Sequence, residues 1–158
     1  MLAKTTFLIL SHLAFAALGF VLGIYTLPIL MAPVAPSSSE VSQIEKSAIY
    51  TGEFKRDLTD SDFLHWGEGI LSISANNITL NGQLAPGPAY RLYLSPEFVD
   101  TESAFIALKS EMALVGSIDT FENFIVELPD SVDVTKFNTV VVWCESFDQF
   151  ITAAKYKE

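Results

Sequence analysis

The chain lacks a second cysteine, since Cys144 is the only one among its 158 residues. A single cysteine excludes an internal disulfide, and it excludes covalent haem attachment, which requires a C-x-x-C-H motif. Basic residues are also scarce, because 9 Lys and Arg stand against 19 Asp and Glu and form no local cluster. A chain this acidic repels phosphate backbones, so nucleic-acid binding is not expected.

The sequence also lacks the motifs that name an enzyme. It has no glycine-rich phosphate loop, no nucleophile-elbow serine and no paired-histidine zinc helix. The nitrogen and sulfur donors beyond the apolar N-terminal segment are Cys144, His65 and Met112. No cofactor is required by this sequence. If a noncovalent haem is bound, Cys144 is expected as one axial ligand and His65 or Met112 as the other.

Acidic residues are missing from the first 36 positions, which contain Lys4 as their one base. The apolar run from Thr5 to Met31 exceeds the ~20 residues needed to cross a bilayer. A cleaved signal peptide is the competing interpretation, but its apolar region normally has ~7–15 residues. Here the small residues Ala32 and Ala35 are each followed by proline, which favours a retained signal anchor over residues 1–31.

The distribution of basic residues predicts the orientation of this anchor. Lys4 lies at its start and no further base occurs until Lys46, so the positive-inside bias keeps the N-terminus cytoplasmic. The protein is then a single-pass protein of the cell membrane, with its remaining residues extracytoplasmic, in a bacterial periplasm or at the cell surface. That part holds eight basic residues against 19 acidic ones, a net charge of −11.

Two short features of the N-terminal region bear on partners and spacing. Gly19 and Gly23 have the small-xxx-small spacing that lets two membrane helices form a homodimer, although glycine is also tolerated in a lone span. Residues 32–46 are rich in proline and serine and carry little apolar surface, so we expect a semi-extended linker that buries no face.

From residue 47 to 158 the pattern changes to short alternating runs separated by turn residues, which is typical of an all-β domain. The spacing predicts one short helix behind Asp100 or Thr101, with Ala104, Phe105, Leu108 and Met112 at helical positions. About eight strands and one helix predict a two-sheet β-sandwich. The expected strands cover 49–54, 70–75, 78–84, 90–94, 114–118, 124–129, 140–144 and the segment from 147 to 156.

The valine-rich strand that ends at Cys144 is apolar on both sides. Val140, Val142 and Cys144 share one side, and Val141 and Trp143 share the other, so the strand is expected to be central and covered on both faces. Cys144 then lies where the core meets the rim. It is either a buried, inert cysteine or a reactive group, and free cysteine is often simply core.

Several short motifs together resemble the DM-thirteen domain, over roughly Tyr50 to Tyr156. The residues that carry the resemblance are Phe54, His65-Trp66-Gly67-x-Gly69, Gly87-Pro88, Tyr93-Leu94-Ser95, Leu128-Pro129, Val142-Trp143-Cys144, Phe147, Phe150 and Ala153-Ala154. The most specific of these is the Trp-Cys dipeptide that ends a valine-rich strand. The family often continues Gly-Pro with Asp, where this chain has Ala89.

The resemblance implies a β-sandwich proposed to transfer electrons in animal cell-surface proteins and small bacterial envelope proteins. It implies a redox role for Cys144, as a bare thiol or through a prosthetic group such as haem. We therefore expect a membrane-anchored extracytoplasmic domain that takes part in electron transfer with an unidentified redox partner. The alternative is a non-catalytic binding or structural module of the envelope in which Cys144 is inert.

Overall fold

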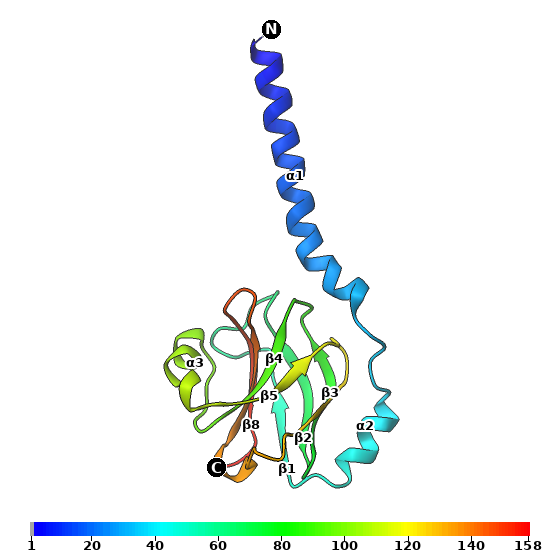
Figure 1. Ribbon diagram of the computed structural model, residues 1–158, viewed down its shortest axis with the longest axis vertical. Helices are drawn as coiled ribbons and strands as arrows, with labels where there is room; N and C mark the ends of the chain where they lie inside the picture. Colours follow the sequence, from blue (N-terminus) through cyan, green and yellow to red (C-terminus); the bar gives the residue numbers. More distant parts are fainter. Residues whose placement is uncertain (1) are drawn as a thin grey trace.

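The computed structural model describes residues 2–158 and consists of one long helix that stands on a two-layer β domain (Figure 1). The helix, α1 (Leu2–Met31), contains Pro28 near its C-terminal end. Its apolar stretch Ala3–Met31 has 29 residues and contains an 18-residue window with a mean hydropathy of 2.3, so it is long and apolar enough to cross a membrane. The predicted anchor also includes Met1, which lies outside the described residues.

Two antiparallel four-stranded sheets form the domain, which confirms the predicted eight-stranded sandwich. The first sheet has the order β1 (Tyr50–Phe54), β2 (Gly67–Ile73), β3 (Asn77–Leu84), β6 (Phe124–Glu127). The second has the order β5 (Ala113–Ile118), β4 (Tyr90–Ser95), β7 (Thr139–Cys144), β8 (Gln149–Lys155).

Strand β7 is central in the second sheet and buried along its whole length, as its sequence predicts. Val140, Val142 and Cys144 belong to an inner cluster that unites side chains of both sheets. The alternate residues Val141 and Trp143 belong to a separate outer cluster on the other face of the sheet. The members of this outer cluster are Tyr93, Val99, Phe105, Val141, Trp143, Phe150 and Ala153.

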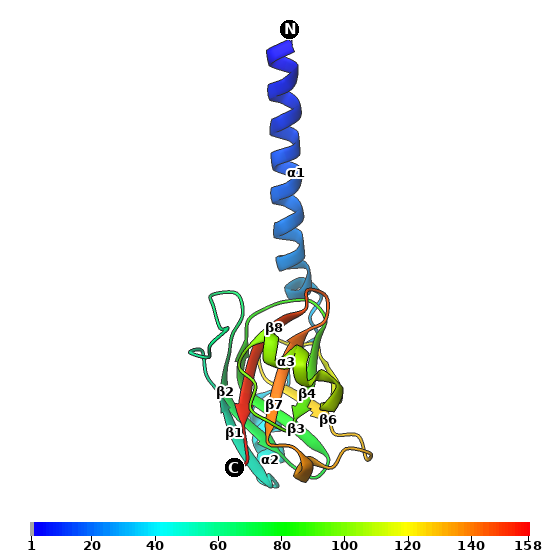
Figure 2. The same cartoon turned by 90° about the vertical axis from the view of Figure 1, so that its left-hand side faces the viewer.

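Helix α3 (Glu102–Leu108) lies over the face of the second sheet (Figure 2) and contributes Phe105 to the outer cluster. Its N-cap is Thr101, one of the two expected caps, whose side chain accepts a hydrogen bond from the Ala104 amide. A 3₁₀ turn (Lys109–Glu111) follows it, and a second one occurs at Val134–Lys136. Phe105 is fully buried and anchors the helix to the sheet.

Strand β2 begins at Gly67, three residues before the predicted start at Ile70. A Cβ atom at Gly67 would lie 2.5 Å from Thr152 Cγ2 on β8, so only glycine allows the two sheets to approach here. Gly69 has φ = 126°, a conformation that L residues rarely adopt. These glycines shape the strand and the contact between sheets.

Residues 32–46 differ from the semi-extended stalk that their composition predicts. They contain helix α2 (Ser38–Glu45), which starts with a capping box between Ser37 and Glu40. Val41 on this helix is fully buried, so the expectation that the segment buries no face was wrong. A single apolar residue sufficed, because α2 lies beside β3 (Figure 1) and the Asn123 side chain donates to the Pro36 carbonyl, 3.1 Å away.

The C-terminal end of α1 meets one end of the sandwich, and the chain's C-terminus lies at the other end (Figure 1). The turn between β7 and β8 lies directly below α1 (Figure 2). Cys144 ends the strand that leads into this turn. The topology therefore places the only cysteine at the α1 end of the domain.

Candidate functional site

Cys144 is held at the end of β7 by contacts on both sides. It is paired with Tyr90 on β4 and with Gln149 on β8. The residue is only 3% exposed, and its Sγ donates a hydrogen bond to the Pro88 carbonyl, 3.1 Å away. The sulfur therefore carries its proton in this arrangement, because a thiolate would face the lone pairs of a carbonyl oxygen.

The electrostatic surroundings favour the same protonation state. Burial raises the pKa of the Cys144 thiol, and hydrogen bonds from the backbone amides of Phe147 and Ser146 only partly offset that effect. The negative charges of Asp148 and Glu145 raise the pKa further. Cys144 is thus a neutral thiol at physiological pH, unlike the low-pKa thiolates of reactive cysteines in electropositive sites.

The two loops around Cys144 are strained. Ala89, next to Pro88, has φ = 52°, and Asp148, in the β7–β8 turn, has φ = 50°. Within residues 2–158 these are the only residues other than glycine with positive φ. Left-handed backbone costs an L residue roughly 1–2 kcal/mol, and such strain tends to gather at functional sites. The loops are joined by a hydrogen bond from the Glu145 amide to the Ala89 carbonyl, 3.2 Å long.

A pocket of about 430 Å³ opens beside Cys144. Its walls come from four parts of the chain: α1, the loop before β2, the loop before β4, and the β7–β8 turn with its flanking strands. Most of its surface is apolar. The lining includes Tyr25, His65, Pro88, Tyr90, Cys144 and Phe147. The structure therefore brings two of the three predicted site residues, Cys144 and His65, to one cavity.

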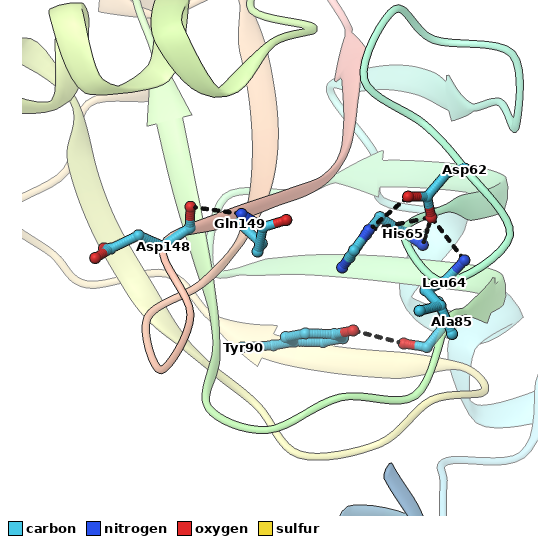
Figure 3. A network of polar contacts seen from close by, with 7 residues as sticks. All are labelled: Asp62, Leu64, His65, Ala85, Tyr90, Asp148 and Gln149. Carbon is cyan, nitrogen blue, oxygen red and sulfur yellow. Dashed lines mark hydrogen bonds and ion pairs between the residues drawn. The ribbon is translucent and has the colours of Figure 1, made fainter. Parts of the chain in front are cut away.

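The His65 ring is oriented by Asp62 (Figure 3). The Asp62 carboxylate accepts hydrogen bonds from the Leu64 amide at 2.7 Å, the His65 amide at 2.8 Å and His65 Nδ1 at 3.1 Å. Burial acts to raise the pKa of Asp62, but these hydrogen bonds outweigh it and hold that pKa below its usual value. In the neutral ring Nδ1 then carries the proton and Nε2 is a free acceptor.

Figure 3 shows the His65 ring turned toward the space between Gln149 and Tyr90. Tyr90 forms part of the pocket wall, and its hydroxyl donates to the Ala85 carbonyl, 2.9 Å away. Burial raises the pKa of Tyr90, so it stays a neutral phenol. This hydrogen bond fixes the Tyr90 ring. His65 Nε2 is then a polar atom of the pocket that has no hydrogen-bond partner within residues 2–158.

Met112 does not reach this pocket. It follows the 3₁₀ turn after α3 and packs against the outer cluster, on the Trp143 side of the sheet. Cys144 belongs to the inner cluster on the opposite side. The helical spacing of Met112 with Phe105 and Leu108 therefore reflects packing on the outer face of the sheet. Met112 and Cys144 lie on opposite faces, so they cannot both bind one iron atom.

The residues of this pocket do not fit a haem or a metal ion well. A metal-bound cysteine must be deprotonated, whereas the Cys144 sulfur is a buried thiol that donates to a carbonyl oxygen. In the part of the chain that the structure describes, no group of three or more His, Cys, Asp or Glu side chains could hold a metal ion. We therefore derive no reaction through a prosthetic group.

Residues missed at the sequence level complete the site. Asp62 lies in an acidic loop with no distinguishing motif, and Tyr90 was expected only as a strand residue. The α1 residues Val21, Ile24 and Tyr25 also line the pocket. One signal could have found Asp62, because an Asp three residues before a His often accepts the local amides and fixes the ring. No local pattern links α1 to the pocket, because that contact depends on the packing of distant segments.

An aromatic group lies directly behind Cys144, on the outer face of the sheet. The rings of Phe105 and Trp143 stack with centroids 3.9 Å apart and an angle of 8°, and Tyr93 meets Phe105 edge-on at 5.2 Å. The Tyr93 hydroxyl donates to Glu145, which also accepts from Lys109 Nζ. The two residues that flank Cys144 in sequence, Trp143 and Glu145, thus both contact this aromatic group.

Comparisons with known proteins give one result. Searches of curated proteins and of solved structures found no match. A family model described as Electron transfer DM13 matches residues 53–156, which cover His65, Cys144 and all strands except the first three residues of β1. The matched segment is about two thirds of the chain and coincides with the resemblance of the short motifs. The chain therefore belongs to the Electron transfer DM13 family.

Proposed function

We propose that the protein is a membrane-anchored, extracytoplasmic electron-transfer protein whose redox group is the Cys144 thiol. The observation that carries the proposal is that the only cysteine of an electron-transfer family member lines a pocket together with an oriented imidazole. The residues that line the pocket supply a neutral thiol and a proton acceptor beside an apolar cavity.

The membrane part of the proposal depends on α1. The 29 residues of Ala3–Met31 form an apolar helix that is exposed along its length, as expected for a lipid-facing span. A cleaved signal sequence would share its length and composition. The proline after each small residue near its end favours retention, and Lys4 favours a cytoplasmic N-terminus. The domain boundaries at residues 31 and 46 and a dimer through Gly19 and Gly23 belong to the same proposal.

The chemistry proposed for the site follows from the protonation states. A neutral thiol gives up an electron most easily together with its proton, since removing the electron alone would leave a positive charge in a buried site. His65 lines the same pocket and its Nε2 is an acceptor. We assign Cys144 as the electron-donating group and His65 as the proton acceptor of this step. The redox partner is the one-electron oxidant, and Cys144 becomes a neutral thiyl radical.

A second candidate function is a non-catalytic envelope module with an inert cysteine. The burial and raised pKa of Cys144 favour it, because both make the thiol slow to react as a nucleophile. The two functions differ in what the pocket must allow. An inert core cysteine has no need of a cavity beside it, whereas a redox thiol does.

Labelling of the native protein separates these candidates. The full chain, purified from its own membranes into lipid nanodiscs, is treated with N-ethylmaleimide, and adducts are counted by mass spectrometry with and without denaturant. A visible absorption spectrum of the same sample tests for a coloured cofactor. We expect slow native labelling of Cys144 and no visible band. Labelling only after denaturation would support the inert module, and a haem spectrum would contradict the bare thiol.

A further inference from the structure

One wall of the pocket beside Cys144 is made by the helix that we propose spans the membrane. Val21, Ile24 and Tyr25 of α1 line it together with His65 and Cys144. Figures 1 and 2 place this end of the sandwich directly at the end of α1. The pocket is therefore bounded partly by a lipid-facing helix and partly by the β domain.

The length of α1 locates the pocket with respect to the bilayer. A helix of 29 residues is about 44 Å long, whereas the hydrocarbon core is about 30 Å thick. A span of ~20 residues that starts near Thr5 ends near Ile24. Tyr25 then lies at the headgroup level, where tyrosine is enriched. The pocket opens at the outer surface of the membrane, within reach of molecules dissolved in it.

The polar group that the pocket offers selects a ligand with a hydrogen-bond donor. Asp62 accepts from His65 Nδ1, so Nε2 of the neutral ring is an acceptor, and Figure 3 shows the ring directed into the space beside Tyr90. A ligand that meets Nε2 must supply an O–H or N–H group. A simple acyl chain has no such group.

The shape and lining favour an aromatic head. Three rings, those of Tyr25, Tyr90 and Phe147, line the pocket and can pack against a planar ring. The volume of about 430 Å³ lies within the range of small-molecule sites, roughly 300–1,000 Å³. It accommodates one substituted ring, with space toward α1 for an apolar tail.

We propose that this pocket binds a hydroquinone with an apolar tail, taken directly from the bilayer. One phenolic O–H of the head donates to His65 Nε2, the ring lies among Tyr25, Tyr90 and Phe147, and the tail extends along α1 into the lipid. The inference rests on the proposed function, because it assumes that α1 spans the membrane and that the pocket is the redox site. It names the reductant of that site. After the redox partner has oxidised Cys144 and His65 has released its proton, the hydroquinone gives one electron to the sulfur radical and one phenolic proton to His65, which passes the proton to the sulfur. The thiol is thereby restored and a semiquinone leaves.

Binding by the full chain in nanodiscs tests this site. The probes are 2-decyl-1,4-hydroquinone and its dimethyl ether, which keeps the ring and the tail but has no O–H donor. Equilibrium dialysis, corrected with empty nanodiscs, gives the dissociation constants. We expect the hydroquinone to bind at least tenfold more tightly than the ether. Equal affinities would show a pocket that recognises only apolar bulk, and would overturn the proposal.

Three variants test the assigned contacts. Asp62→Asn offers an amide N–H to His65 Nδ1, which moves the ring proton to Nε2 and turns that atom into a donor. We expect this variant to lose its preference for the hydroquinone and to bind the oxidised 2-decyl-1,4-benzoquinone more tightly than wild type does. Ile24→Trp fills the pocket from the α1 side and should abolish binding of both the hydroquinone and the benzoquinone. Its matched control is Leu22→Trp, about 200° away around the helix and absent from the pocket lining.

The variants also keep this inference separate from the proposed function. Ile24→Trp lies outside the sandwich and leaves the packing of the β domain unchanged. Hydroquinone binding that survives Ile24→Trp, or that Leu22→Trp removes equally, would contradict the pocket assignment. If no hydroquinone binds while Cys144 still exchanges electrons with an electrode, the ligand class is wrong and the electron-transfer proposal stands. If the hydroquinone binds but Cys144 exchanges no electrons, the ligand class stands and the electron-transfer proposal is wrong.

Discussion

At the residue scale, the structure gives Cys144 a defined partner that alters the expected effect of its replacement. The Sγ donates to the Pro88 carbonyl. A serine hydroxyl can donate to the same oxygen, so the apolar site that a sequence reading expects around position 144 contains one acceptor. Cys144→Ser should therefore cost no more than about 1 kcal/mol, whereas Cys144→Ala leaves that carbonyl unpaired and should cost about 1–2 kcal/mol.

The raised pKa of Cys144 predicts a pH dependence of stability. Its pKa is higher in the folded than in the unfolded state, so the thiol contributes stability below its unfolded pKa. That contribution is lost as the pH rises through the folded pKa. Urea unfolding of wild type and Cys144→Ser between pH 7 and about pH 10 measures it. We expect the free energy of unfolding of wild type to fall relative to that of the serine variant in the upper half of this pH range. If the two free energies change in parallel with pH, burial does not perturb the thiol.

Ala89 predicts a stabilising substitution. Its φ of 52° is costly for alanine, and its side chain is exposed, so Ala89→Gly relieves strain without loss of packing. The expected gain is about 0.5–1 kcal/mol after the extra flexibility of glycine in the unfolded chain is deducted.

Thermal unfolding compares Ala89→Gly with the control Ala75→Gly. Ala75 is exposed, lies in the β2–β3 turn and does not have a positive φ. The control should lose stability, because glycine there adds only unfolded-state freedom. A loss of similar size at both positions would show that Ala89 is not strained.

At the element scale, the strands were predictable because alternation along each strand matches the faces of a sandwich. The valine-rich strand fixed the division between the inner and outer clusters, and Thr101 was among the expected caps. The Asp62–His65 pair is local, and its spacing of three residues could have indicated it. The packing of helix α2 and the α1 wall of the pocket could not be derived, because both depend on contacts between distant segments. Met112 was misplaced for the same reason: its helical spacing gave its neighbours but not the face of the sheet they cover.

Helix α3 predicts the stability of the outer cluster. Phe105 is fully buried between Tyr93 and Trp143, so Phe105→Ala should cost about 3–5 kcal/mol through lost burial and a residual cavity. The adjacent Ile106 is 62% exposed, and Ile106→Ala should change stability by no more than about 0.5 kcal/mol. Denaturant titration of both variants checks this difference. Equal costs would mean that α3 is not anchored through Phe105.

At the scale of the whole molecule, the pocket is built jointly by the β-sandwich and by helix α1. The sandwich supplies a thiol and an oriented imidazole at one end, and α1 closes the pocket at that same end. Because α2 packs on the domain, the linker is shorter and more ordered than a free stalk. If α1 spans a membrane, as we propose, the pocket is consequently held close to the membrane surface.

This arrangement predicts the topology of the protein in cells. The helix over residues 5–31 should remain attached, with the C-terminus outside. Protease added to intact cells, after removal of any outer membrane, should digest the β domain and spare a cytoplasmic marker protein. N-terminal sequencing supplies the opposing outcome, because a mature protein that begins near Pro33 or Pro36 would remove the anchor.

The most direct test of the account is whether electrons pass through Cys144. Film voltammetry of the full chain, purified from its own membranes and held in a lipid layer on an electrode, measures this without knowledge of the natural partner. Wild type should give a faradaic current that is absent from Cys144→Ala, while circular dichroism shows the same β fold in both. A current of equal size in the alanine variant, or none in wild type, would contradict the electron-transfer role of Cys144 and leave the inert envelope module in its place.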